Sequence, residues 1–263
     1  LVKKIFREAD QILGFDISKI ILDGPKSDLD LTENTQPAIF LVGYSIYQLA
    51  IKEFNIKLDK ADFIAGHSLG EYTALACSDS INFSDCLKLL KIRGKSMQEA
   101  MPVGEGGMIA VLGINISEIE KIIENNKKNF TCYIANDNTE GQVVISGKLD
   151  DLKKFSDFLK INKIRNIKLP VSAPFHCELM SYATKVMNKE IMNTEFKTPI
   201  NDIISNVTAK PIKDPKEIRD LLIKQIEKPV RWRETVINMI NSDVNKFIEI
   251  GPGKVLSGLI KRI

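Results

Sequence analysis

The pattern of apolar and polar positions predicts a chain in which helices and strands alternate. Apolar side chains at helical spacing predict helices, and short continuous apolar runs bounded by turn residues predict buried strands. In the first hundred residues this pattern gives helices at 2–13, 35–54, 71–77 and 85–100 and a strand at 62–65. Gly14 ends the first helix, Pro37 suits the first turn of the second, and Ser84 caps the fourth. A mixed, turn-rich segment, broken at Gly24 and Pro25, separates the first two helices.

The middle of the chain has a different pattern, with four short strands and two helices in close succession. The strands are predicted at 108–112, 130–135, 142–146 and 164–169, and the helices at 117–126 and 149–160. Ser117 and Glu120 have the spacing of a capping box at the start of the first of these helices. The order βαββαβ is that of a ferredoxin-like unit. We therefore predict a small ferredoxin-like subdomain at residues 107–170, inserted into a large α/β domain formed by residues 1–106 and 171–263.

The last third of the chain returns to longer helices separated by short strands. Helices are predicted at 179–192, 215–225, 230–241 and after Gly253, with strands at 202–206 and 246–250. Strands that alternate with helices are typical of a parallel sheet covered on both faces, as in the hydrolase-like α/β folds. A cleft between this large domain and the small subdomain is a natural place for a ligand.

Ser68 lies at the centre of the run Gly66-His67-Ser68-Leu69-Gly70, between a predicted strand and a predicted helix. A G-x-S-x-G run in that context is typical of a nucleophile elbow, a sharp turn that presents the serine above the edge of the sheet. We expect glycine to be required at both Gly66 and Gly70, where the backbone passes close to itself. The amide groups of the following helix could stabilise an oxyanion beside the hydroxyl. The alternative interpretation is a tight turn with an idle serine.

A nucleophilic serine needs a base within hydrogen-bond reach, and the chain has only two histidines. His67 is the immediate neighbour of Ser68, so we expect its side chain to point away and brace the turn. That leaves His176, in the loop that leads out of the small subdomain, as the candidate base. No acidic residue is marked by a motif as the group that orients the imidazole, and the HGGG-type motif of esterases is absent. These two features weigh against a plain hydrolase.

Arg93 is the second unusual side chain. It lies four residues after Leu89 and four before Met97, so it emerges from the apolar side of its predicted helix. A charge in that place needs an anion, which either the protein or a ligand could supply. The alternative is an arginine that extends to the edge of the helix or pairs with an acidic residue.

Composition narrows the class of protein. The chain has 263 residues and is 44% hydrophobic, enough for one large domain or for a large and a small one. The 37 basic and 34 acidic residues leave a dispersed net charge of +3, so we expect no nucleic-acid partner. The four cysteines form no C-x-x-C pair, which favours free thiols in a reducing compartment such as the cytoplasm. No window approaches the roughly 18 apolar residues of a membrane span, and no signal peptide is visible, so we expect no membrane association.

Six motifs follow one another along nearly the whole chain. They are Thr35-Gln36-Pro37-Ala38, Gly66-His67-Ser68-Leu69-Gly70-Glu71-Tyr72, Arg93-Gly94-Lys95-x-Met97-Gln98, Pro174-Phe175-His176-Cys177, Pro229-Val230-x-Trp232 and Glu249-Ile250-Gly251-Pro252-Gly253-Lys254-Val255-Leu256. Together they resemble the malonyl-CoA:acyl carrier protein transacylases of fatty acid synthesis and the acyltransferase domains of polyketide synthases. The resemblance implies ping-pong transfer of a malonyl group from malonyl-CoA to the phosphopantetheine thiol of acyl carrier protein, with no cofactor and no metal. It also implies an acidic carrier partner, so we expect a basic patch near the cleft, and we expect a monomer.

The resemblance implies catalytic roles for four residues. Ser68 would be the acylated nucleophile and His176 the base that serves each thiol in turn. Arg93 would pair with the malonyl carboxylate, which gives its charge a reason to lie on an apolar helix face. The main-chain carbonyl of Gln225, seven residues before Trp232, would orient the imidazole.

Four further residues are expected to line the acyl pocket. The N–H of Leu69 would supply one oxyanion donor, and Gln36 and Asn206 would lie nearby. Phe175 before the histidine and the aliphatic Leu69 after the serine are similar to the residues of malonyl-using members. A Phe ring fills space that an α-methyl group would need, so we expect a preference for malonyl over methylmalonyl worth about 1 to 3 kcal/mol.

The start of the chain departs from the family pattern. Family members begin with a strand and a G-Q-G-S-Q loop that adds to the oxyanion pocket, and this chain starts at Leu1, after the place where they would stand. We expect a truncated sequence, because loss of an oxyanion donor typically costs on the order of 100- to 1,000-fold in rate. Two alternatives to a transferase remain: a serine thioesterase or hydrolase, and a catalytically impaired binding module.

Overall fold

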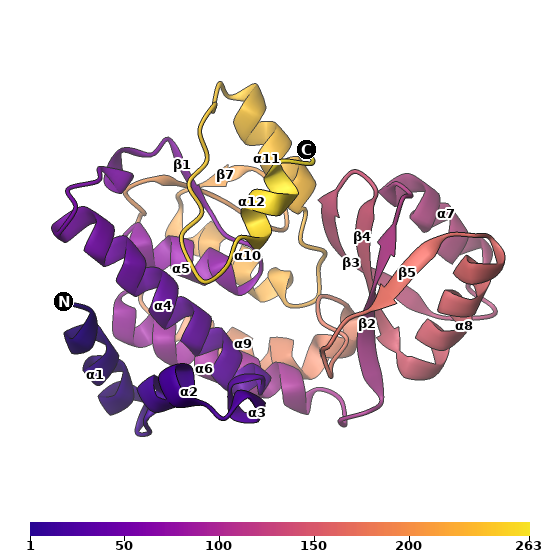
Figure 1. Ribbon diagram of the computed structural model, residues 1–263, viewed down its shortest axis with the longest axis horizontal. Helices are drawn as coiled ribbons and strands as arrows, with labels where there is room; N and C mark the ends of the chain where they lie inside the picture. Colours follow the sequence, from indigo (N-terminus) through magenta and orange to yellow (C-terminus); the bar gives the residue numbers. More distant parts are fainter.

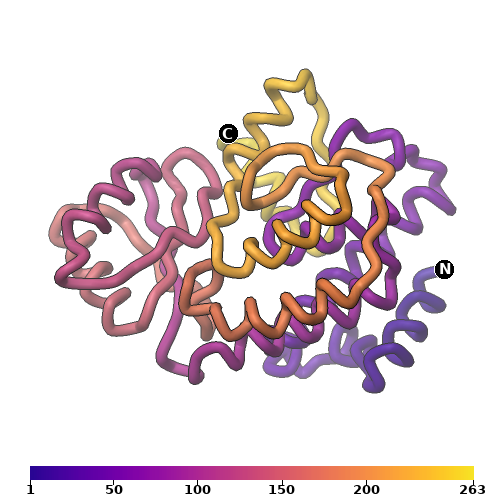
Figure 2. Tube along the Cα trace, turned by 180° about the vertical axis from the view of Figure 1, so that it is seen from behind, coloured from indigo at the N-terminus to yellow at the C-terminus, as the bar shows by residue number.

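The structure, a computed structural model, describes residues 1–263, which form two lobes that lie side by side (Figure 1). The smaller lobe is built around a four-stranded sheet, and the larger lobe contains a three-stranded sheet surrounded by helices. The N-terminus lies on the side of the larger lobe that is remote from the smaller one, as both views show (Figure 2). No helix combines the length and the apolar character that a membrane crossing requires.

The larger lobe contains ten helices and three short strands. The helices are α1 (Val2–Leu13), α2 (Ile17–Asp23), α3 (Lys26–Leu29), α4 (Thr32–Lys52), α5 (Leu69–Cys77), α6 (Phe83–Glu99), α9 (Ser181–Met192), α10 (Pro215–Gln225), α11 (Trp232–Asn241) and α12 (Val255–Ile260), with 3-10 turns at Leu58–Lys60 and Glu178–Met180. The strands are β1 (Phe63–Ala65), β6 (Asp202–Ile204) and β7 (Pro211–Ile212). β6 lies in the middle of the sheet, parallel to β1 and antiparallel to β7. The carboxyl ends of β1 and β6 therefore meet at one edge, where Ser68 and Asn206 follow.

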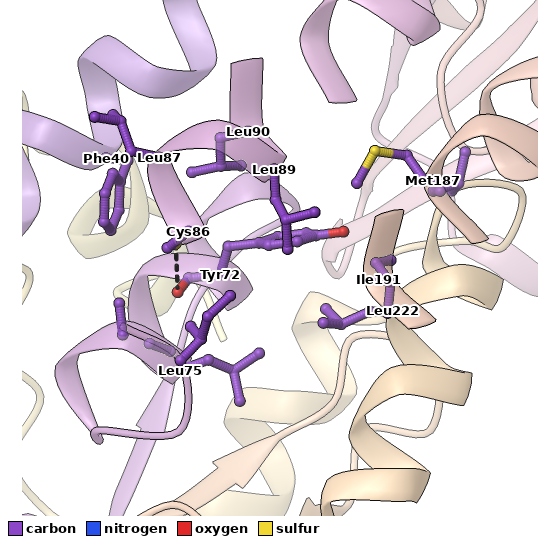
Figure 3. Close-up of a cluster of buried hydrophobic side chains, with 14 of the residues drawn as sticks. Phe40, Tyr72, Leu75, Cys86, Leu87, Leu89, Leu90, Met187, Ile191 and Leu222 are labelled. Atoms are coloured by element: carbon purple, nitrogen blue, oxygen red, sulfur yellow. Dashed lines mark hydrogen bonds between the residues drawn. The ribbon is translucent and has the colours of Figure 1, made fainter. Parts of the chain in front are cut away.

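A core of 28 buried residues holds the larger lobe together. Figure 3 shows its centre, where side chains from α4, α5, α6, α9 and α10 converge: Phe40, Tyr72, Leu75, Cys86, Leu87, Leu89, Leu90, Met187, Ile191 and Leu222. Burying a side chain of this size contributes about 1.5 to 3 kcal/mol relative to leaving it exposed. Close approach is required as well, because a Cβ on Gly94 of α6 would lie 2.4 Å from the Thr32 carbonyl oxygen of α4. The helices of the larger lobe are therefore tightly packed against one another.

The smaller lobe has the topology of a ferredoxin-like unit. Its elements are β2 (Gly106–Leu112), α7 (Ile116–Asn125), β3 (Cys132–Thr139), β4 (Gln142–Lys148), α8 (Leu149–Ile161) and β5 (Arg165–Lys168). The strand order is β3-β4-β2-β5, and every neighbouring pair is antiparallel. A separate core, which includes Ile119, Phe130 and Phe155, lies within this lobe.

β3 connects the two lobes at its carboxyl end. The Val230 N–H donates to the Ala135 carbonyl at 2.8 Å, and the Asp137 N–H donates to the Val230 carbonyl at 2.9 Å. The Arg233 side chain of α11 donates through Nε to both carboxylate oxygens of Asp137, at 3.1 and 3.0 Å. Backbone pairing and an ion pair therefore fix the small lobe against the segment that leads into α11.

The predicted α/β fold with an inserted ferredoxin-like unit is confirmed, and several details differ. The sheet of the larger lobe is small and only partly parallel, since β7 was not predicted and is antiparallel. The segment at 246–250 was predicted as a strand and pairs with no strand of either sheet, and Ile248 within it is exposed. A short apolar segment forms a strand only where a neighbouring strand supplies hydrogen-bond partners.

The beginnings of three helices were also misplaced. α4 starts at Thr32, three residues earlier than predicted, so Pro37 lies beyond the first turn. The side chains of Asn34 and Thr35 donate hydrogen bonds to carbonyl groups of α3, which stabilises this earlier start. Asn82, rather than Ser84, caps α6 by accepting from the Asp85 N–H at 2.8 Å. The capping box of α7 is formed by Asn115 and Glu118. The segment predicted as turn-rich contains the two short helices α2 and α3, which the break at Gly24 and Pro25 separates.

Candidate active site

Ser68 lies in a sharp turn between β1 and α5. Its backbone has φ 54° and ψ −111°, a conformation that a residue with a side chain rarely adopts. A Cβ on Gly66 would lie 1.9 Å from the Gly70 carbonyl oxygen, so the turn can close only with glycine at Gly66. The prediction that Gly70 is equally constrained was wrong, because no atom outside its chain neighbours and the backbone of its own helix lies within 4 Å of the place where its Cβ would be.

The Ser68 hydroxyl and the His176 imidazole are in hydrogen-bond contact, with Oγ 2.7 Å from Nε2. The other ring nitrogen, Nδ1, lies 2.8 Å from the main-chain carbonyl of Gln225. A carbonyl can only accept, so Nδ1 carries the proton and Nε2 presents its lone pair to the serine. Arg93 Nη2 donates to the same Oγ at 3.1 Å, so the hydroxyl proton is left to point toward Nε2. This is the arrangement of a nucleophile and a general base.

His176 is held rigidly and in the neutral form. It is 3% exposed and has a positive φ of 59°. The preceding residue is fixed to the small lobe, because Ser146 Oγ of β4 donates to the Phe175 carbonyl at 2.5 Å. Burial, and after it the positive charge of Arg93, lower the pKa of His176 to about 3, against the hydrogen bond to Gln225. The imidazole is therefore available as a base at neutral pH.

Arg93 reaches the serine from α6 and is 1% exposed. Its guanidinium donates to three oxygens: Gln36 Oε1 at 2.7 Å, Ser68 Oγ at 3.1 Å and Gln225 Oε1 at 3.0 Å. Neither alternative raised for this residue is seen, since its side chain does not reach solvent and forms no ion pair with a carboxylate. Burial is the largest influence on its pKa, which is lowered, and nearby Tyr72 and Glu71 oppose that effect. A buried guanidinium beside the nucleophile is suited to receive an anionic group of a substrate.

The side chains of Asn206 and Gln225 form hydrogen bonds with the backbone of the elbow. Asn206 Oδ1 accepts from the Ser68 N–H at 2.7 Å, and its Nδ2 donates to the Gly66 carbonyl at 2.7 Å. Gln225 Nε2 donates to the Ser68 carbonyl at 3.0 Å. The Glu71 carboxylate, which is 1% exposed, accepts from the Asn206 main-chain N–H at 3.1 Å and from Gln225 Nε2 at 2.7 Å. Asn206, Gln225 and Glu71 therefore form one connected hydrogen-bond network with the elbow.

Sequence reasoning missed Glu71 and the side chain of Gln225. Glu71 stands within the second of the quoted motifs, but a glutamate in the first turn of a helix is ordinarily explained by the helix dipole. Its largely apolar neighbours on α5 were the one signal that this carboxylate is buried. Gln225 entered only through its main-chain carbonyl, and nothing local indicates that its amide faces Arg93.

Leu69 and Phe175 flank the two reacting groups. Leu69 is the first residue of α5, where amide groups have no partner within the helix and can face an anion. Both side chains are half-buried and pack against the main core. His67 turns away from the serine, with Nε2 2.9 Å from Asn138 Oδ1 of β3 and its ring 5.7 Å from that of Trp232.

A cavity of about 580 Å³ opens beside His176, between the two lobes. It is lined by residues of α7, β3 and the loops at 176–178 and 227–229. Four glutamates, Glu120, Glu124, Glu178 and Glu227, line it with one lysine, Lys228. The predicted basic patch therefore does not lie at this opening. No group of three or more histidine, cysteine or acidic side chains is placed to hold a metal ion.

Comparisons with known proteins agree with this geometry. The family described as acyl transferase domain matches residues 3–262. A malonyl CoA-acyl carrier protein transacylase of Haemophilus influenzae is 37% identical over 264 residues, which is 100% of this chain and 84% of the relative. A crystal structure of an acyl-carrier-protein S-malonyltransferase from Bartonella henselae superposes with a TM-score of 0.95 at 39% identity, covering 99% of this chain and 83% of that one.

A second solved structure contains a partner. It is a complex of a type II polyketide synthase acyl carrier protein with its malonyl transacylase, and it matches with a TM-score of 0.93 at 36% identity, covering 99% of this chain and 84% of that one. The match to the family spans nearly every residue, and the same fold is found in solved members at more than a third identity. The chain therefore belongs to the acyl transferase domain family.

Proposed function

We propose that this chain transfers the malonyl group of malonyl-CoA to the phosphopantetheine thiol of acyl carrier protein, for fatty acid synthesis. The observation that carries the proposal is the buried Arg93 guanidinium, which donates to the same Ser68 oxygen that faces His176. Attack on a thioester requires only the serine nucleophile and the histidine base. A buried arginine beside them is explained by an acyl group that carries a free carboxylate, with which the guanidinium can pair. The names of relatives such as that of Haemophilus influenzae support the same substrate.

Acylation of Ser68 would be the first half of a ping-pong reaction. Ser68 Oγ attacks the thioester carbonyl of malonyl-CoA while His176 Nε2 takes the hydroxyl proton. The N–H of Leu69 stabilises the oxyanion. The C–S bond then breaks, and the CoA sulfur leaves with the proton that Nε2 returns. The acyl group remains on Ser68 as an ester, with its carboxylate against Arg93.

Transfer would reverse these steps with a new thiol. His176 takes the proton of the phosphopantetheine thiol of acyl carrier protein, and the sulfur attacks the malonyl ester. The C–O bond to Ser68 breaks, and Nε2 returns the proton to Oγ. The Gln225 carbonyl keeps the imidazole in the same tautomer through both halves, since Nδ1 never loses its proton.

Several further properties belong to the proposal. Phe175 and Leu69 would favour malonyl over methylmalonyl, and Gln36 and Asn206 would hold Arg93 and the elbow in place. The division into 1–106 with 171–263 and 107–170 would place the site where the two parts meet. The reaction as written uses no cofactor. We further propose a monomer in the cytoplasm, where the four buried free cysteines would stay reduced.

The test is intact-mass measurement after incubation with malonyl-CoA. We expect one malonyl group on the wild-type chain and none on Ser68→Ala. Arg93→Ala should lose at least about 30-fold in malonyl loading, because loss of one partner of a buried charge pair costs about 2 kcal/mol or more. Acetyl loading from acetyl-CoA should fall far less, and equal losses would refute the carboxylate role.

The same experiment addresses the two alternatives. A thioesterase would release free malonate in the absence of acyl carrier protein, whereas a transferase keeps the acyl-serine from water until a thiol arrives. A catalytically impaired binding module would show no adduct on the wild-type chain.

A further inference from the structure

Glu71 is a buried carboxylate that the proposed reaction does not use. It lies in the first turn of α5, three residues after Ser68, and is 1% exposed. Oε2 accepts from Gln225 Nε2 at 2.7 Å and from the Asn206 N–H at 3.1 Å, while Oε1 has no hydrogen-bond partner. No lysine or arginine forms an ion pair with it. A buried carboxylate without a direct cation is costly, so its charge must be offset by something nearby.

The Gln225 amide connects Glu71 to Arg93. Its Nε2 donates to Glu71 Oε2, and its Oε1 accepts from Arg93 Nη2 at 3.0 Å. A guanidinium can only donate and an ionised carboxylate can only accept, so these two neighbours allow one orientation of the amide. If the amide were rotated by half a turn, its NH2 group would face Arg93 and its oxygen would face Glu71. The carboxylate, together with the Ser68 carbonyl that accepts from the same Nε2 at 3.0 Å, therefore determines which end of Gln225 meets the guanidinium.

The charges of Glu71 and Arg93 also influence each other's pKa. The pKa of Glu71 is raised to about 7, because the effect of burial exceeds the opposing effects of the hydrogen bonds from Gln225 and Asn206 and of the charge of Arg93. Burial lowers the pKa of Arg93, and the charge of Glu71 opposes that fall. Each charge makes the other less costly in a region without solvent. The bridging amide keeps them apart, so the guanidinium is not occupied by a direct ion pair.

We propose that Glu71 is a positioning residue, which holds the Gln225 amide and, through it, the Arg93 guanidinium in the arrangement that receives an acyl carboxylate. The inference rests on the proposed function, because it requires Arg93 to bind the malonyl carboxylate. Glu71 touches no reacting atom. Its effect should therefore fall on the choice between acyl groups and on the KM for malonyl-CoA, more than on the chemistry at Ser68.

Glu71→Gln, assayed at about pH 8 so that the wild-type carboxyl with its pKa of about 7 is mostly ionised, is the variant that isolates the charge. A glutamine can place its oxygen where Oε2 lies and its NH2 where the unpartnered Oε1 lies, so the acceptor for Gln225 is kept and the negative charge is lost. We expect the ratio of malonyl to acetyl loading, measured from malonyl-CoA and acetyl-CoA, to fall about tenfold, since weakening one hydrogen bond to a charged group has an effect of that size. The rate at which an uncharged fluorophosphonate labels Ser68 should change less than about threefold. Glu71→Asp, which keeps the charge, should recover part of the ratio.

The control is Glu217→Gln, which removes an exposed carboxylate from α10, the helix that carries Gln225. It should leave the loading ratio unchanged. Because both loading rates scale with the amount of folded enzyme, the ratio stays meaningful even if Glu71→Gln is partly unfolded. An unchanged ratio in Glu71→Gln, whether both rates fall together or neither falls, overturns the inference. Failure of the wild-type chain to load malonyl would instead overturn the proposed function.

Discussion

Two glycines of the same five-residue run are predicted to respond to alanine in opposite ways. A Cβ on Gly66 would lie 1.9 Å from the Gly70 carbonyl oxygen, 2.0 Å from the Gly70 carbonyl carbon and 2.6 Å from the Glu71 nitrogen. All three are backbone atoms of the first turn of α5, so no side chain can rotate away. The elbow itself would have to open, and Ser68 would move with it.

The size of each effect follows from this geometry. Overpacking of an interior costs about 1 to 3 kcal/mol, and contact with backbone puts Gly66→Ala at the upper end of that range or beyond. For a chain of this length about 3 kcal/mol lowers the melting temperature by roughly 6 to 12 °C. A Cβ on Gly70 meets no atom within 4 Å other than its chain neighbours and the backbone of its own helix. Since alanine favours a helix over glycine by about 0.5 to 1 kcal/mol, Gly70→Ala should melt roughly 1 to 4 °C higher than wild type.

Thermal unfolding followed by circular dichroism measures both shifts. Labelling of Ser68 by a fluorophosphonate, measured well below the melting temperature, reports the elbow itself and should be slowed strongly in Gly66→Ala. If Gly66→Ala melted within about 2 °C of wild type, the steric account of the elbow would be wrong. A clear loss of stability in Gly70→Ala would show that the turn constrains that position after all.

Three further predictions concern buried polar groups. Burial and Arg93 hold the pKa of His176 near 3, below its ordinary value near 6.5, so its contribution to stability is complete above pH 6.5 and is lost as the pH falls toward 3. In urea unfolding, wild type should lose up to about 1.4 kcal/mol per pH unit relative to His176→Gln over that window, and parallel curves would contradict the shift. Arg233→Ala leaves the Asp137 carboxylate buried without its partner and should cost about 3 kcal/mol by the same measurement, part of which Asp137→Asn should restore; a loss below about 0.5 kcal/mol would contradict this. Burial raises the pKa of Cys132 and of Cys177 to about 12, so an aromatic disulfide reagent should label no thiol in the native chain and all four after denaturation; rapid native labelling would contradict their burial.

The fold was largely predictable because its signals are local. Helical spacing indicated α1 to within a residue, and the βαββαβ order indicated the small lobe, whose strand order then follows from the chirality of its crossovers. The segment at 246–250 shows the limit of such reasoning. Its apolar residues Phe247, Ile248 and Ile250 favour a strand, and whether it forms one depends on a partner strand that lies elsewhere in the chain.

Helix starts were less predictable because several residues compete for each cap. Ser84 and Asn82 are both good capping residues, two positions apart, and only the path of the chain before α6 selects Asn82. The same competition between Ser117 and Asn115 was decided in favour of Asn115. A two-residue error at a surface cap leaves the packed face of the helix unchanged, so these errors did not affect the prediction of the site residues.

Some residues of the site could be predicted from the sequence, because they belong to a motif or to a rare residue type. The elbow motif indicated Ser68, and a chain with two histidines left one candidate for its base, 108 residues away. Glu71 could not be found in that way. Its partners are the main-chain N–H of Asn206 and the side-chain amide of Gln225, which are 135 and 154 residues away, and neither group carries a charge that would mark it in the sequence.

For Arg93 the sequence correctly indicated a buried charge that needs partners, but it did not indicate which groups those partners are. A guanidinium on an apolar helix face called for an anion, and the structure places no carboxylate against it. Its charge is instead distributed over three neutral oxygens, of Gln36, Ser68 and Gln225, with Glu71 one amide further away. If Glu71 formed a direct ion pair with Arg93, an incoming carboxylate would have to displace it and leave a buried charge unpaired, at a cost of several kcal/mol. With an amide between them the resting charges are balanced, and the guanidinium can still accept an anion beside the nucleophile.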